Sequence, residues 1–380
     1  MKRLDRKALS RKAGIFISIL VSLSFLLFIS QPDVAINYMK RGLDLCARVV
    51  IPSLFPLMVV SELTARGPLG RLLGRLLSRP AAWLLGVGED SACAFIFGTL
   101  CGFPIGARTL CDAYDRGRIS SRELTRSLSF CNNPGAAFVI SAVGVSVFGS
   151  LRIGILLFLS VILSAMLVGI VMRIAFGKVV AGQVEKVKER NIEATHARSA
   201  IYELTGAVRS SATAMLTVCA FIAFFSELVG CVGAVLSQMG ISDDLTAAII
   251  CAFEISGGVR AAAGLPYPLS LLLAAATLGW SGISVHFQIM TVVGERRVSF
   301  APYFAAKLSQ SVVATVLTAI FLKFFAVSEK NFGEIAAFKS EANAKSGFLL
   351  CVALAFVSIL TIFIDKMRAK QCKKSNRKFF

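Results

Sequence analysis

The run IGILLFLSVILSAMLVGIVM, residues 153–172, contains no charged side chain and decides the fold class. A helix needs roughly 20 predominantly apolar residues to cross the hydrocarbon core of a bilayer, so this run predicts a transmembrane helix. Further uncharged runs are Ala13 to Ser30, Ser127 to Leu151, Ala261 to Gly294 and Gly347 to Ile364. A chain with several such runs is predicted to be an all-α, polytopic membrane protein.

The composition agrees with lipid as the main solvent. Of all residues 56% are hydrophobic and only 17% are charged, and the mean hydropathy is +0.74. The first apolar run follows a basic leader, which leaves a cleaved signal peptide as an alternative to a retained helix. The run lacks a small-residue cleavage pattern near Gln31, so we interpret it as a retained first span.

The formal net charge of +19 would suggest nucleic acid as a partner of a soluble protein. Here the cations cluster in short segments beside the apolar runs, without the interleaved aromatic residues of a nucleic-acid surface. Cytoplasmic loops of membrane proteins carry such an excess of Lys and Arg, so the expected partner is the bilayer and not nucleic acid. The ten cysteines form no Cys-x-x-Cys pair and predict no metal site.

The basic segments also orient the spans. With the leader inside, they predict eight transmembrane helices plus two re-entrant helical hairpins, with both termini cytoplasmic, in a bacterial multi-pass membrane protein. The arginines of residues 66–79 lie on one helical face, which is typical of an amphipathic helix on the inner surface. The predicted full spans are residues 13–31, 43–64, 127–149, 151–176, 205–228, 268–293, 304–325 and 347–364.

The two predicted hairpins occupy residues 91–107 and 246–265. Gly102, Pro104 and Gly106 break the first segment, and Gly257 and Gly258 break the second, so the chain can turn back at each place. A hairpin keeps the arginine cluster that follows the first segment on the cytoplasmic side. The alternative, ten plain spans, would export that cluster.

Two parts of the chain resemble each other. VVSEL at 59–63 matches FFSEL at 224–228, and each motif precedes a connector, a hairpin and two long spans. The predicted topology places these units in opposite orientations, as in secondary transporters whose binding site lies at the repeat interface near mid-membrane. The expected parts are 1–42 with the first span, repeat 43–177, cytoplasmic linker 178–204, inverted repeat 205–327, and 328–380 with the last span and a basic tail.

Carboxylates within spans are costly and therefore point to function. Glu227 stands alone in an uncharged stretch, Glu62 is its counterpart in the first repeat, and Glu254 lies at the second hairpin turn. Such groups can coordinate Na⁺ or carry a coupling proton. For Glu62 and Glu227 the alternative is a structural role, in which each pairs with Arg66 or with interfacial water.

Arg108 and Arg260 share one position in the two repeats, just past the hairpin turns. A guanidinium can hold a carboxylate through two hydrogen bonds, so both are candidates for binding an anionic substrate. Asn132 and Asn133, followed by Pro134, interrupt a span and offer amide donors and acceptors for a ligand.

The corresponding place in the second repeat holds Trp280 and Ser281, a flat aromatic ring beside a small hydroxyl, which we also predict to contact substrate. His286 follows and could be structural or could carry a proton. Catalytic patterns are absent: the sequence contains no Gly-x-Ser-x-Gly, His-Glu-x-x-His or Walker motif. No enzymatic activity and no cofactor is expected, apart from a coupling Na⁺ or H⁺.

The motifs together resemble a known family, the YlbJ-type sporulation integral membrane proteins with nucleoside recognition, or Gate, domains. The resemblance covers about residues 43–327 and rests on PSLFP at 52–56, SEL at 61–63, GFPIGA at 102–107 and SFCNNPG at 129–135. It implies a fold similar to concentrative nucleoside transporters. It also implies a role in spore formation in Firmicutes, in moving dipicolinic acid across the outer forespore membrane.

The sequence leaves three functions open. The first is a transporter or facilitator of a small organic anion such as dipicolinate. The second is a nucleoside transporter coupled to Na⁺ or H⁺, and the third is a membrane scaffold for spore-envelope assembly that transports nothing. The residues leave open the driving ion, the direction of transport and whether the chain forms a homo-oligomer.

Overall fold

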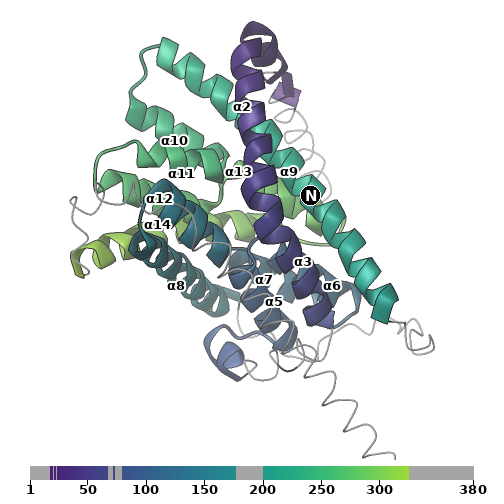
Figure 1. The fold of residues 1–380 in the computed structure, drawn as a ribbon. Helices are drawn as coiled ribbons and strands as arrows, with labels where there is room; N and C mark the ends of the chain where they lie inside the picture. The colour runs from purple at the N-terminus through teal and green to yellow at the C-terminus, as the bar shows by residue number, and fades with distance from the viewer. Residues whose placement is uncertain are drawn as a thin grey trace, which may run out of the picture.

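The computed structural model describes residues 18–66 apart from 20 and 23, residue 72, and residues 79–176 and 200–324. Within these ranges the regular structure is helical, and no strand occurs (Figure 1). The basic leader, nearly all of the predicted surface helix at 66–79, most of the linker at 178–204 and the predicted last span at 347–364 lie outside the described residues.

The first described helices form a long rod that packs on the longest helix of the protein. The rod consists of α2 (Pro32–Leu45), the π-helix η1 (Cys46–Val50) and α3 (Ile51–Arg66), and its partner is α9 (Ala200–Gln238). Gly230 of α9 lies against the ring of Tyr38, and Gly42 of α2 lies against Ser226, so the two helices run antiparallel. Glycine is required at these crossings because any side chain would hold the backbones apart.

Two pairs of short helices turn back on themselves. The first pair is α5 (Glu89–Leu100) with α6 (Ile105–Asp115), and the second is α10 (Asp243–Phe253) with α11 (Ile255–Ala263). Each of these helices has nine to twelve residues, about half of what a bilayer crossing requires. The chain reverses at residues 101–104 and at Glu254. Gly102 and Pro104 lie in the first turn as predicted, whereas Gly106 lies inside α6, and Gly257 and Gly258 lie inside α11 and not in the second turn.

A broken helix follows each pair. After the first pair, α7 (Ser121–Cys131) ends in an extended segment at 132–135, and the chain resumes in the π-helix η2 (Ala137–Val147). After the second pair, α12 (Leu269–Trp280) ends at Ser281, whose φ of 77° is left-handed, and α13 (Gly282–Val293) follows. Each broken helix leads to a long helix, α8 (Leu151–Phe176) or α14 (Phe300–Phe324).

Four stretches in the described part are long and apolar enough to cross a membrane: Leu151–Ala175, Glu203–Gln238, Leu269–Val293 and Phe300–Phe324. The protein is therefore a helical membrane protein. The predicted spans 43–64 and 127–149 do not reach this standard, because only Leu54–Thr64 and Ala137–Val147 form apolar helices there. The break at Asn132 and the polar sequence of α7 shorten the second of these.

The ends of α6 and α13 meet at one surface of the molecule. Arg296 donates two hydrogen bonds to Asp115, at 2.8 and 2.5 Å, and this contact raises the pKa of the guanidinium. Nearby, the Ser121 hydroxyl donates to the carbonyl of Arg297. The contact places the two segments, both predicted to be cytoplasmic, on the same side of the molecule.

Candidate functional site

A cavity of about 490 Å³ lies where the two helix pairs and the first broken helix meet, and we call it the central cavity. The first pair and the first broken helix contribute Gly102, Phe103, Pro134, Gly135 and Phe138. The second pair and α13 contribute Glu254, Ile255, Ser256, Val285 and Gln288, and the rod and α9 contribute Val50, Leu54, Val218 and Ile222. The wall is mostly apolar, with few polar groups, as is typical of small-molecule sites.

Glycine at two positions lets the helix pairs touch the helix breaks. A Cβ on Gly102, whose φ is +86°, would lie 2.7 Å from the backbone nitrogen of Gly135. A Cβ on Gly282, whose φ is +81°, would lie 3.0 Å from the carbonyl oxygen of Phe253. Both glycines have left-handed conformations that L side chains adopt only with strain. Each turn is therefore packed directly against the break of the broken helix that follows it.

Glu254 is the carboxylate in the wall of the central cavity, and it is almost completely buried. Its side chain accepts hydrogen bonds from the backbone N–H groups of Ser256, at 2.9 Å, and Gly257, at 2.5 Å. The residue thus caps the N-terminus of α11, where the helix dipole favours negative charge. The predicted position of Glu254 at the second turn, facing a binding cavity, agrees with this geometry.

Gln288 projects from α13 into the same wall. The residue is 3% exposed, and its Oε1 is buried with no hydrogen-bond partner among the residues that the structure describes. An unpaired buried amide oxygen is expensive, so a polar ligand in the cavity is a reasonable partner for it. The sequence analysis missed Gln288, although it is the single amide in the uncharged run 261–294.

Asn132 and Asn133 lie behind the cavity wall and do not line it. Their amide groups donate to the carbonyls of Leu128, at 2.9 Å, and Phe130, at 2.8 Å, at the end of α7. From α14, Gln310 donates to Asn133 Oδ1 at 2.8 Å. The two asparagines therefore hold the broken helix in shape, while Pro134 and Gly135 after them face the cavity.

Lys307 joins the same cluster from α14 and is fully buried. Its Nζ donates to the backbone carbonyl of Asn132 and, at 2.8 Å, to Gln310 Oε1. We did not predict Lys307 from the sequence. The sequence does single it out, because Lys307 is the sole formally charged residue in 298–322, a stretch that forms most of a predicted span.

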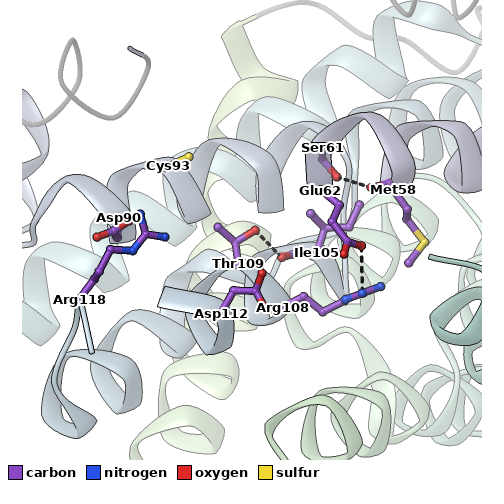
Figure 2. Close-up of a pocket in the computed structure, with 10 residues that line it drawn as sticks. All are labelled: Met58, Ser61, Glu62, Asp90, Cys93, Ile105, Arg108, Thr109, Asp112 and Arg118. Carbon is purple, nitrogen blue, oxygen red and sulfur yellow. Dashed lines mark hydrogen bonds and ion pairs between the residues drawn. The ribbon is translucent and has the colours of Figure 1, made fainter. Parts of the chain in front are cut away.

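A second cavity, of about 540 Å³, lies between α3 and the first helix pair and is more polar (Figure 2). Carboxylates and guanidinium groups face each other across it, with Arg108 3.1 Å from Glu62 and Arg118 3.0 Å from Asp90. The residues that line it are Met58, Ser61, Glu62, Asp90, Cys93, Ile105, Arg108, Thr109, Asp112 and Arg118. We call it the polar cavity.

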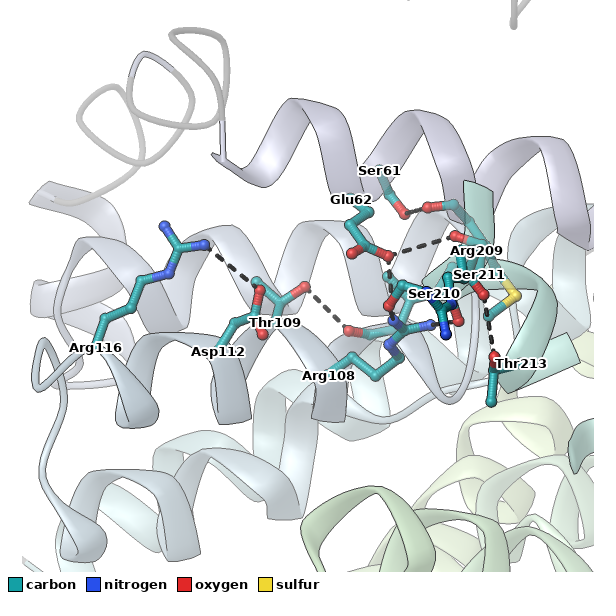
Figure 3. Close-up of polar contacts among 12 residues, drawn as sticks. Ser61, Glu62, Arg108, Thr109, Asp112, Arg116, Arg209, Ser210, Ser211 and Thr213 are labelled. Carbon is teal, nitrogen blue, oxygen red and sulfur yellow. Dashed lines mark hydrogen bonds and ion pairs between the residues drawn. The ribbon is translucent and has the colours of Figure 1, made fainter. Parts of the chain in front are cut away.

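Arg108 links α3, α6 and α9 through hydrogen bonds in the polar cavity (Figure 3). From α6 it reaches Glu62 on α3, and it also donates to the hydroxyl of Ser210 and, at 3.3 Å, to the Ser210 carbonyl on α9. The Ser211 hydroxyl donates to Glu62 at 3.4 Å. Predicted residues Glu62 and Arg108 are thus brought together, in the polar cavity and away from the central one.

Comparison with known proteins gives one significant match among curated sequences. The chain is 29% identical over 348 residues to the sporulation integral membrane protein YlbJ of Bacillus subtilis (strain 168), covering 81% of this chain and 83% of that protein. The match confirms the resemblance to the YlbJ-type proteins that the sequence motifs indicate. No family model matches the chain, and no solved structure matches it significantly.

Trp280, Ser281 and His286 lie at or near the second helix break but do not line either cavity. Trp280 donates to the Ala252 carbonyl at 2.9 Å, and Ser281 forms the left-handed turn. His286 Nδ1 lies 2.9 Å from the hydroxyl of Tyr303, and its ring stacks edge-on against Trp280. These side chains close the second break and are structural in this conformation.

Two further predicted residues lie apart from both cavities. Arg260 is exposed in the last turn of α11, where a cation is favourable to the helix dipole. Glu227 is buried in α9, and its Oε1 has no hydrogen-bond partner in the described part of the chain. The structure therefore places neither proposed anion-binding arginine in the central cavity.

Proposed function

We propose that this protein moves a small organic anion, dipicolinic acid, across a membrane during sporulation, with the central cavity as its binding site. One observation carries the proposal: two helix turns and a helix break meet around a mostly apolar cavity that holds a capped carboxylate and an unpaired amide. Turns and breaks at membrane depth are tolerated where they line such a cavity. The similarity to a sporulation protein supports the setting.

The order of elements supports an inverted repeat as the basis of transport. Helix pair, broken helix and long helix follow one another twice, once from α5 to α8 and once from α10 to α14. We infer that the helix pairs are re-entrant hairpins among eight spans, that the two series have opposite orientations, and that both termini are cytoplasmic. In a sporulating cell, the outer forespore membrane is the proposed location.

Glu254 gives the proposed transport a coupling group. An ionised carboxylate in the wall would repel an anionic substrate, because a charge interaction is strong where water is excluded. A proton or Na⁺ bound at Glu254 removes that repulsion and would enter with the substrate. Gln288 offers the substrate a donor and an acceptor from α13.

The contact between Arg108 and Glu62 is the proposed gate on the polar side. Met58, Ile105 and Met215 belong to one apolar cluster, and the first two also line the polar cavity. Two other members of that cluster, Val50 and Val218, line the central cavity, so the cluster separates the two cavities. Release of Arg108 from α3 and α9 would free the first helix pair to move and open a path.

A nucleoside is the second candidate substrate, and Glu254 is the observation that favours it. A carboxylate beside an amide suits a neutral ligand with hydroxyl and N–H groups, as a ribose and base provide. For such a ligand Glu254 would accept a hydrogen bond, and no accompanying cation would be required to offset substrate charge.

Flux into liposomes containing the purified protein tests these functions. We expect labelled dipicolinate to enter faster than labelled uridine, and Gln288→Leu to slow that entry at least tenfold. Gln238→Leu is the matched control, because Gln238 is exposed at the end of α9 and should change nothing. Faster uridine entry would favour the nucleoside transporter, and entry of neither compound would favour the scaffold.

A further inference from the structure

Lys307 is a buried cation that the binding geometry above does not use. It lies in α14, one of the four apolar stretches long enough to cross a membrane, and has no exposed surface. Its two hydrogen-bond acceptors, the Asn132 carbonyl and Gln310 Oε1, are neutral. Among the described residues, no carboxylate lies within ion-pair distance of its Nζ.

A lysine in this position is costly unless it serves a function. An ammonium group removed from water and from counter-charges loses several kcal/mol of hydration, and residues of this kind in membrane helices mark substrate or ion sites. Bracing the broken helix does not require the charge. Gln310 already braces it with neutral hydrogen bonds to Asn133, at 2.8 Å, and to the Val161 carbonyl, at 3.3 Å.

The ammonium group lies directly behind the wall of the central cavity. It contacts the carbonyl of Asn132, and Pro134, two residues further on, lines the cavity. Two residues of extended chain span at most about 7 Å. A unit charge about 10 Å from a ligand, at an effective dielectric constant near 20, changes the affinity for a charged ligand roughly tenfold per ligand charge.

In the described part of the chain, no lysine or arginine lines the central cavity. Arg108 is bound to Glu62 and Ser210 in the polar cavity, and Arg260 is exposed. Lys307 is the cation that donates a hydrogen bond to segment 132–135, which forms part of the cavity wall.

We propose that Lys307 is the specificity-determining residue that makes the central cavity select an anionic ligand, by placing an uncompensated positive charge behind the segment 132–135. The proposal rests on the transport function proposed above. A ligand carboxylate in the cavity adds a counter-charge to Lys307, which has no carboxylate within ion-pair distance among the described residues.

The test compares two ligands of nearly equal shape, dipicolinate and its neutral analogue pyridine-2,6-dicarboxamide, by equilibrium binding to the purified full-length protein. The wild-type protein should bind the dianion at least tenfold more tightly than the diamide. Lys307→Gln should weaken dipicolinate binding about tenfold or more and change diamide binding less than twofold. Lys307→Arg, which keeps the charge, should preserve the preference for the dianion, and Lys323→Gln, an exposed change in the same helix, should preserve both affinities.

Equal weakening of both ligands in Lys307→Gln would show a merely structural role and overturn the proposal, as would unchanged binding. If Lys307→Gln does not fold, the wild-type comparison decides, because equal affinity for the dianion and the diamide also overturns it. A wild-type protein that binds the diamide but not dipicolinate would overturn both this proposal and anion transport. Dipicolinate flux that persists in Lys307→Gln with unchanged selectivity would overturn this proposal alone.

Discussion

The two helix breaks of this protein are built in different ways. The first, at 132–135, is four residues long and is supported by polar side chains from α14, far away in the sequence. The second consists of two left-handed residues, Ser281 and Gly282, and is closed by close contact of Gly282 with the preceding helix pair and by the bond from Trp280 to Ala252. A buried polar network supports one break, and mainly backbone packing supports the other.

This difference indicates which of the two breaks can change its structure when a ligand binds. Backbone packing has one arrangement, because neighbouring atoms leave no room for another. A network of amide and ammonium groups can exchange partners at small cost, provided that every buried group keeps one. We therefore expect ligand-dependent change at the first break, next to Pro134 and Gly135, and a rigid second break.

The largest loss of stability is expected from a substitution where the first helix pair crosses the end of α7. A Cβ on Gly98 or Gly106 would overlap the carbonyl oxygen of Cys131. Because a backbone atom cannot move aside, Gly106→Ala should destabilise the protein by about 3 kcal/mol or more. Thermal unfolding of detergent-solubilised protein measures this change.

Two other glycine variants provide a comparison for that loss of stability. In the second helix pair, a Cβ on Gly257 would lie 3.1 Å from a carboxylate oxygen of Glu254, so Gly257→Ala should cost about 1 kcal/mol. Gly206→Ala has open space around it and should be neutral or slightly stabilising. A smaller loss in Gly106→Ala than in Gly257→Ala would contradict the comparison.

The next largest loss of stability is expected in the polar network that supports the first break. Gln310→Leu removes the acceptor of Lys307 and the donor to Asn133, which leaves a buried charge with one acceptor fewer. We expect a loss of about 2–3 kcal/mol in unfolding free energy, as for hydrogen bonds to charged groups. Ser311→Ala is the matched control on the same helix. It removes one neutral bond, to Ala276 at 2.8 Å, and should cost about 1 kcal/mol.

A smaller effect of opposite sign is expected at the second break. Ser281 has a φ of 77°, which glycine adopts without strain. Ser281→Gly should therefore stabilise the protein by up to about 1 kcal/mol, measured as a raised unfolding temperature. Asn132→Gly should destabilise it, because Asn132 has a φ of −108° and donates to Leu128. If both glycine variants change stability in the same direction, the two breaks are not built differently.

The sequence predicted those features that local chemistry determines. The turns at Gly102 and Glu254 and the break at Asn132 follow from glycine, proline and polar residues in apolar runs, and the structure has them there. The number of spans was harder to predict, because the sequence places the break at Asn132 but does not show that the helices on either side are each too short to cross a membrane.

Side-chain partners from distant helices could not be derived from the sequence. Lys307 and Gln310 meet the Asn pair across more than 170 positions, and Arg108 reaches Ser210 across 102. Spacing along the chain gives no measure of such contacts. The sequence predicts that both asparagines contact substrate, but their amide N–H groups already donate to the Leu128 and Phe130 carbonyls within the fold.

The smallest effect is the change in dipicolinate flux expected when Arg260 is substituted. This substitution tests whether the two helix pairs have the same role. Arg108 and Arg260 occupy matching sequence positions, but Arg108 contacts Glu62 and Ser210, whereas Arg260 is exposed. Arg260→Ala should leave dipicolinate flux within about twofold of wild type, because an exposed charge is screened by solvent. Arg108→Ala removes the tie to α3 and α9 and should change flux several-fold, with little loss of stability, since a partly exposed ion pair contributes at most about 1 kcal/mol. Loss of flux in Arg260→Ala with normal insertion would mean that α11 turns this side chain toward the substrate in another conformation, and that the two helix pairs share one role.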